Sequence, residues 1–363
     1  MKTNVTTESG SIRSFFRAKG VAAALLCAGL LSCPVAALSE IPRGVFSIAN
    51  VNKNPSTTVL QNPDVDGISL RQDWATLEPT EGNFNFTYLD GAVALCTANG
   101  KQALIRIGTQ DSKPAWVTTA VKLAHGKFFS FLNGTVTTKI PVFWDPTFLA
   151  KKTAMIRALG AHFTNNPTVT IVVASFANST SEDWGVPHTA TDITNWFRLG
   201  YTTQLMLDTG ATIINTTMTA FPNQFVTLAV GGNGSGGALH LDPTDDYLAR
   251  NAILNARALW PGRMIAQKND LKTCIPVAPG TDSLYSMIWD FQPDVGGQMV
   301  FQCFGDLTYK ANCAILIDPA LALTLSVTAA ITYGEKYVEI YSTDVVNLPA
   351  VITFAHAALH AQP

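Results

Sequence analysis

Charged side chains are scarce in this sequence of 363 residues. They make up 14% of the chain, and the formal net charge at pH 7 is −2, whereas a typical globular protein has about 25% charged residues. The scarcity excludes the strongly basic surface that binds nucleic acid. Thr, Asn and Gln are plentiful instead. A polar but sparsely charged surface suits uncharged, hydroxyl-rich ligands better than phosphates.

Several motifs of common enzyme classes are also missing. The sequence has no CxxC or Cys/His spacing of a zinc site, and its six histidines form no HExxH motif and no recognised ligand pair. The Gly-rich run at residues 231–237 lacks the Lys and Ser/Thr of a phosphate loop and the spacing of a G-x-S-x-G nucleophile. We therefore expect no metal, no cofactor and no serine nucleophile.

The N-terminus has the pattern of a secretory signal. Basic residues precede the apolar run Val21 to Leu31, and the small residues Val35 and Ala37 stand where a signal peptidase cuts. The run is shorter than the about 20 apolar residues of a membrane-spanning helix. We expect residues 1–37 to be a signal peptide and the protein to be secreted or periplasmic, with no stable membrane span. A retained anchor, or a lipid attached at Cys33, is the alternative.

Loss of residues 1–37 leaves 20 basic and 25 acidic residues, a net charge of −5. Four cysteines remain, an even number that fits an oxidising compartment. They are Cys96, Cys274, Cys303 and Cys313. Cys303 and Cys313 could close a short loop, and both buried thiols and structural disulfides are compatible with the spacing.

Short β-rich segments alternate with longer helical patterns along residues 38–363, which indicates repeated βα units and a parallel sheet. Eight strands in eight such units predict a single (β/α)8 barrel domain. The expected strands are 44–49, 67–73, 102–108, 169–176, 225–231, 263–268, 298–304 and 337–341. The expected helices include 145–163, two within 190–220, 245–259 and 319–331.

One insertion interrupts the alternation. Residues 128–143 alternate around Asn133-Gly134, which predicts a β-hairpin with a type I′ turn after the third strand. That strand end lies on the face where barrel enzymes keep their sites. The hairpin either forms one wall of a cleft or is a peripheral addition.

Residues 67–117 resemble the second and third βα units of clan A glycoside hydrolases, most closely the family 42 β-galactosidases. In that family a strand ends in Trp, acid-Pro and acid-Gly turns follow, and the next strand leads into Pro-Ala-Trp. The matching residues here are Trp74, Glu78-Pro79, Glu81-Gly82, Phe84, Phe86, Leu89-Asp90 and Pro114-Ala115-Trp116. The resemblance implies a (β/α)8 barrel and cleavage of glycosidic bonds.

Such cleavage needs two carboxyl groups, which the clan places after the fourth and seventh strands. Glu182 is the candidate general acid, although Ser181 stands directly before it where the family has Asn. After the seventh strand Asp306 is the only carboxylate, and Gln302 stands where the clan has its nucleophilic Glu. An amide cannot form the glycosyl ester, so Asp306 must reach in from the loop or the retaining mechanism is absent.

The eighth strand offers a third carboxylate. If Glu339 faces inward it needs a partner such as Arg71 or Arg106, because an unpaired buried charge is costly. The pair would be either structural or catalytic. Expected substrate-binding residues are Arg71, Trp74, Arg106, Trp116, Trp184, Gln267 and Asn269. Tryptophans stack on sugar rings, and core packing is the alternative for each.

The sequence thus favours a glycoside hydrolase acting on neutral oligo- or polysaccharides through Glu182 with Asp306 or Glu339. A carbohydrate-binding barrel that has lost the catalytic pair is the alternative. A lyase or transglycosidase using the same cleft is a third possibility, and its products would distinguish it.

Overall fold

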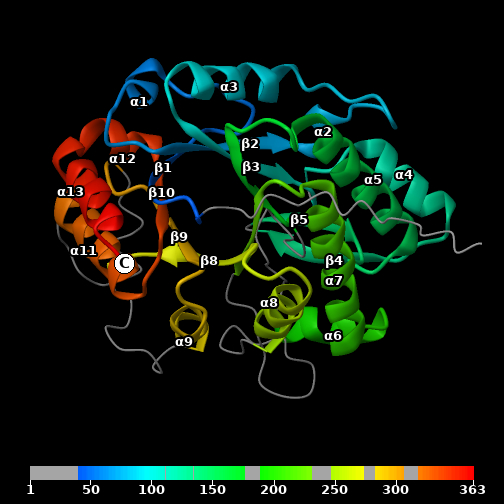
Figure 1. Cartoon of the computed structure of the whole chain (residues 1–363). Coiled ribbons are helices and arrows are strands. Elements are labelled where there is room, and N and C mark those ends of the chain that lie inside the picture. Colours follow the sequence, from blue (N-terminus) through cyan, green and yellow to red (C-terminus); the bar gives the residue numbers. More distant parts are fainter. Residues whose placement is uncertain are drawn as a thin grey trace, which may run out of the picture. The chain divides into compact units, whose positions relative to one another are not determined.

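The computed structural model describes residues 40–110, 112–133, 135–175, 189–230, 247–273, 283–305 and 318–363. Within them, eight parallel strands close into a barrel in the order β1-β10-β9-β8-β7-β6-β3-β2 (Figure 1). These strands are β1 (Gly44–Ile48), β2 (Gly67–Asp73), β3 (Gln102–Gly108), β6 (Val169–Val173), β7 (Phe225–Val230), β8 (Met264–Leu271), β9 (Val295–Met299) and β10 (Tyr337–Tyr341). The predicted (β/α)8 barrel is confirmed.

Helices surround the barrel (Figure 1). They are α1 (Thr57–Leu60), α2 (Trp74–Leu77), α3 (Thr87–Ala98), α4 (Ala115–Leu123), α5 (Pro146–Phe163), α6 (Ala190–Arg198), α7 (Thr203–Ala220), α8 (Tyr247–Leu259), α9 (Ser283–Asp290), α11 (Pro319–Thr332), α12 (Ser342–Asn347) and α13 (Pro349–His360). The described part of the chain contains no helix that is both long and apolar enough to cross a membrane.

Side-chain caps explain why the helix boundaries could be read from the sequence. Asp145 and Asp318 accept backbone N–H groups at the starts of α5 and α11, and each is followed by proline. Thr189 and Asp192 form a reciprocal capping box at the start of α6. The two helices expected within residues 190–220 are confirmed.

The side chains inside the barrel change from apolar to polar along its axis. Inward side chains near the N-terminal ends of the strands form an apolar cluster, separate from the larger core between strands and helices. Its buried members are Phe46, Leu104, Ile171, Phe225, Ile265 and Tyr337, together with Val173 at the C-terminal end of β6, which is in register with Thr227. Two residues further along several strands, the inward side chains are polar. Because the side-chain period of a strand is 2, this polar layer lies above the apolar one, toward the C-terminal end.

The predicted insertion is a hairpin of β4 (Phe128–Asn133) and β5 (Val136–Pro141). Asn133 pairs with Val136, so Asn133 belongs to the strand and not to the turn as expected. The ring of Phe129 stacks on Trp196 of α6 at 3.6 Å between centroids. The hairpin is therefore anchored by aromatic packing, and its role as a cleft wall stays a prediction.

The seventh barrel strand corrects the sequence prediction. β9 covers Val295–Met299, earlier than the expected 298–304. The expected strand began just after Gly297, and a Cβ at Gly297 would lie 1.8 Å from the Oε2 atom of buried Glu335. The Glu335 side chain thus packs closely against Gly297 inside this strand. Consequently Gln302 lies three residues beyond the strand end, and Gln298 is the amide within the barrel.

Candidate active site at the C-terminal end of the barrel

A buried ion pair forms the centre of the polar layer. Glu339 of β10 faces Arg106 of β3 in direct contact, and the two side chains are 0% and 1% exposed. Gln267 of β8 donates from Nε2 to the same Glu339 oxygen at 2.5 Å. The structure thus brings together three of the residues that the sequence singled out, and Arg106 is the arginine that meets Glu339.

The Gln267 side-chain amide links this pair to two hydroxyl groups. Its Oε1 accepts from Tyr337 Oη at 2.6 Å and from Thr227 Oγ1 at 3.2 Å, and its Nε2 also donates to Asn269 Oδ1 at 2.7 Å. Burial raises the pKa of Tyr337, and the Glu339 carboxylate adds to that rise. Tyr337 therefore remains a neutral hydrogen-bond donor, which fixes the orientation of the amide.

The sequence missed two members of this network and one neighbour. Thr227, Tyr337 and Gln298 are buried on β7, β10 and β9, and Gln298 is in register with Glu339. The sequence did contain a weak signal for these three residues, because polar side chains recur at alternate positions of strands that are otherwise apolar. Arg71 is half-buried on β2, in register with Arg106.

Lys268 shows why position along β8 matters. It lies between Gln267 and Asn269, but it points to the other side of the strand, where its Nζ lies 5.6 Å from the ring centre of Tyr285 on α9. Strand alternation therefore assigns Gln267 and Asn269 to the barrel interior and Lys268 to the layer between barrel and helices.

Trp74 and Trp116 pack against each other, and both donate hydrogen bonds to Glu78. Trp74 is fully buried, donates from Nε1 to Glu78 at 2.7 Å and packs edge-on against Trp116. Trp116 is half-buried and donates to the Glu78 carbonyl at 3.0 Å. The other Glu78 carboxylate oxygen accepts the Gly82 N–H at 2.8 Å. Trp74 presents no open ring face to a sugar, so it acts here in packing.

Three of the predicted site residues lie outside the described residues. Glu182 and Trp184 fall in 176–188, between β6 and α6, and Asp306 falls in 306–317, between β9 and α11. Both segments follow C-terminal strand ends, the side on which barrel enzymes keep catalytic residues. Their roles stay predictions.

Asp344 of α12 holds the segment that leads to Asp306. It is fully buried, and its two carboxylate oxygens accept the N–H groups of Cys303 at 2.9 Å and Phe304 at 2.7 Å. The Cys303 thiol is free, and burial raises its pKa to about 12. Its expected partner Cys313 lies outside the described residues.

We expect Asp344→Asn to lower the free energy of unfolding by about 1–3 kcal/mol, because an amide offers one neutral acceptor where two backbone donors meet a carboxylate. Urea unfolding measures the change. Asp290→Asn is the control, since Asp290 is 53% exposed in a surface pair with Arg250 and should cost under about 1 kcal/mol. Equal costs for the two variants would contradict the holding role of Asp344.

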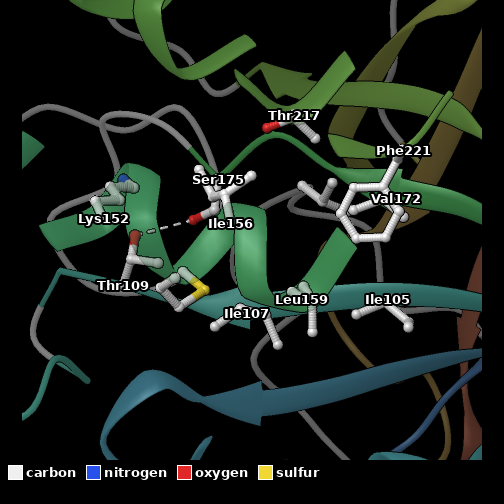
Figure 2. Close-up of a pocket in the computed structure, with 12 residues that line it drawn as sticks. Ile105, Ile107, Thr109, Lys152, Ile156, Leu159, Val172, Ser175, Thr217 and Phe221 are labelled. Atoms are coloured by element: carbon white, nitrogen blue, oxygen red, sulfur yellow. Dashed lines mark hydrogen bonds between the residues drawn. The ribbon is translucent and has the colours of Figure 1, made fainter. Parts of the chain in front are cut away.

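A small cavity lies behind the strands and not at the mouth. It is bounded by β3, β6, α5 and α7, and Figure 2 shows Thr109 and Ser175 joined by a hydrogen bond beside Lys152. The cavity has room for about one water molecule, whose centre can move within about 20 Å³. Burial lowers the pKa of Lys152 to about 7. This cavity is too small for a sugar ring.

The comparisons with known proteins agree with this architecture. Residues 58–198 match the glycoside hydrolase family 42 model, described as Beta-galactosidase. The chain is similar in structure to the catalytic domain of beta-amylase from Paenibacillus polymyxa, with a TM-score of 0.59 and 7% identity over 90% of this chain and 100% of that one. The predicted resemblance to clan A glycoside hydrolases is confirmed, and the chain shares the barrel fold of these neighbours.

Two β-galactosidases are further structural neighbours. The enzyme from Rahnella sp. R3 has a TM-score of 0.55 and 12% identity over 89% of this chain, and that from Marinomonas ef1 has 0.51 and 9% over 82%. The chain spans only 57% and 54% of their lengths. At such identities these likenesses establish the fold alone. No curated protein matches the sequence significantly.

Proposed function

We propose that this protein hydrolyses O-glycosidic bonds in neutral oligo- or polysaccharides at the C-terminal mouth of its barrel. The observation that carries the proposal is the buried Arg106–Glu339–Gln267 network, directly beneath that mouth. Apolar side chains of similar volume would fill the barrel at equal or lower free energy. A charged layer at this position therefore supports a site above it, and the family 42 match supports glycosidic chemistry.

Within this proposal Glu182 is the general acid and Asp306 its partner carboxylate. Glu339 is fully buried, and its Oε1 already meets Arg106 and Gln267. Those contacts suit a carboxylate that positions other groups better than one that must reach a sugar carbon. Asp306 follows the segment fixed by Asp344, which suits a residue that must be held near the mouth.

Reducing-end release from neutral polysaccharides and aryl glycosides tests the proposal. We expect the purified protein to be active on at least one substrate and Glu182→Gln to lose about 10²–10⁴-fold in kcat, the usual contribution of general acid catalysis. Asp306→Asn should also lose activity. Glu81→Gln is the matched control, because Glu81 is 57% exposed in a surface pair with Lys151. Full activity in Glu182→Gln would contradict the assigned acid.

The second candidate is a carbohydrate-binding barrel without catalysis. The lack of any carboxylate in β9 (Val295–Met299), and Ser181 in place of Asn, favour it. An inactive parent protein that is still retarded in a gel containing one of the polysaccharides would support it over hydrolysis. Unsaturated ends or new linkages among the products would indicate a lyase or a transglycosidase.

We also propose that residues 1–37 direct export to the periplasm or medium and are then removed. The basic and apolar segments of the N-terminus support this. N-terminal sequencing of the exported protein should give Leu38 as the first residue. Lipid attached at Cys33 would instead indicate an anchored form.

A further inference from the structure

A cluster of metal-ligating side chains lies at the opposite end of the barrel from the proposed site. Asp66 directly precedes β2, and His356 and His360 are on α13. The Asp66 carboxylate oxygens lie 2.9 Å from His356 Nδ1 and 2.8 Å from His360 Nε2. A third contact, from the Val45 N–H to Asp66 Oδ2 at 2.8 Å, fixes the carboxylate. Three side chains thus converge at one point.

The arrangement has the features of a three-ligand metal site. The two histidines are four residues apart, so they share one face of α13. One ligand atom from each of the three residues lies within 4.8 Å of the others. Zinc bonds of about 2.0–2.1 Å require ligand atoms roughly 3.3 Å apart in a tetrahedron. Small side-chain rotations would open the hydrogen-bonded cluster to that spacing.

Access and space also fit an ion. The side chains of Asp66, His356 and His360 are 14%, 30% and 44% exposed, so an ion and a water ligand can reach them. Gly44 has φ +103, and a Cβ there would lie 1.9 Å from Asp66 Oδ2 and 2.9 Å from His360 Nε2. Only glycine at this position leaves the ligand atoms their room.

We propose that Asp66, His356 and His360 bind one Zn²⁺ ion, with water as the fourth ligand. Two imidazole nitrogens and one carboxylate oxygen suit zinc, whereas Mg²⁺ and Ca²⁺ prefer oxygen ligands alone. The ion ties α13 to the start of β2, and so links the last helix of the barrel to its first units. The sequence pattern did not bring these three residues together, because Asp66 is 290 positions from His356.

Zinc titration of the chelator-treated full-length chain tests the proposal. We expect one Zn²⁺ per chain by calorimetry, and a rise in Tm of a few degrees when zinc is in excess. His356→Gln and His360→Gln should each weaken binding more than about tenfold, at least the cost of losing an outer-shell partner. His162→Gln is the matched control, since His162 pairs with Asp90 at 2.7 Å but with no second histidine among the described residues.

Co²⁺ in place of Zn²⁺ gives a second measurement on the unmutated chain, which does not depend on the folding of any variant. A visible absorption band of four-coordinate Co²⁺ that zinc displaces would support the site. The proposal is overturned if the parent binds no zinc and its Tm is unchanged, or if binding is as tight in both histidine variants as in the parent. Equal binding by Mg²⁺ would also overturn it.

Discussion

Glu339→Gln is expected to lower the free energy of unfolding by about 3–5 kcal/mol. The Arg106 side chain is only 1% exposed, so the variant would bury the guanidinium charge without the carboxylate that faces it. Removing one partner of a buried ion pair typically has a cost of this size. Urea unfolding followed by circular dichroism measures it.

A double replacement distinguishes the contribution of the ion pair to stability from that of packing. Arg106→Met combined with Glu339→Leu should recover most of the loss, because apolar residues of similar volume often replace a buried pair without cost. Glu81→Gln, at an exposed pair with Lys151, should change stability by less than about 1 kcal/mol. If Glu339→Gln costs no more than Glu81→Gln, the pair does not have the energetic role given to it here.

Glu335→Gln is expected to remove a large pH dependence of stability. Glu335 is fully buried against Gly297 of β9, and neither of its carboxylate oxygens has a hydrogen-bond partner among the described residues. Burial raises its pKa from 4.5 to about 8, and nearby Lys268 offsets part of that rise. Between pH 4.5 and 8 the folded chain holds a proton that the unfolded chain has released. The free energy of unfolding therefore falls as pH rises through this window.

The size of that fall follows from the shift, since each pKa unit corresponds to about 1.4 kcal/mol. A rise from 4.5 to about 8 gives a stability loss of up to about 5 kcal/mol by pH 8. The glutamine variant does not titrate, so its stability relative to the parent should increase from pH 5 to pH 8 by a comparable amount. Denaturant midpoints measured across this range test it. A constant difference between variant and parent would contradict a raised pKa.

The fold could be predicted because its signals are local. Caps such as Asp145, and the alternation of β-rich and helical segments, depend on neighbouring residues. The bounds of β2, β3 and β10 were predicted to the residue. The predicted position of β9 was wrong, and Gly297 lies inside the strand with the Glu335 side chain packed against it. Such a contact between different elements leaves no mark in the local pattern.

The residues of the candidate site were likewise predicted only in part. Glu339 and Arg106 were named because charges on short barrel strands need partners, and they do meet. Thr227 and Tyr337 were missed because a single hydroxyl on an otherwise apolar strand is a weak signal until its acceptor, Gln267, is known. Trp74 was named for sugar stacking, but the structure packs it against Trp116 and Phe148. Aromatic type alone does not distinguish these two uses.

The apolar layer at the N-terminal end of the barrel closes its floor. Phe46, Leu104, Ile171 and their neighbours are packed across the interior below Glu339, so the axis of the barrel is no channel for water or ions. The polar layer is therefore closed on the side of the N-terminal strand ends. Any ligand of the proposed site must enter and leave at the C-terminal ends of the strands.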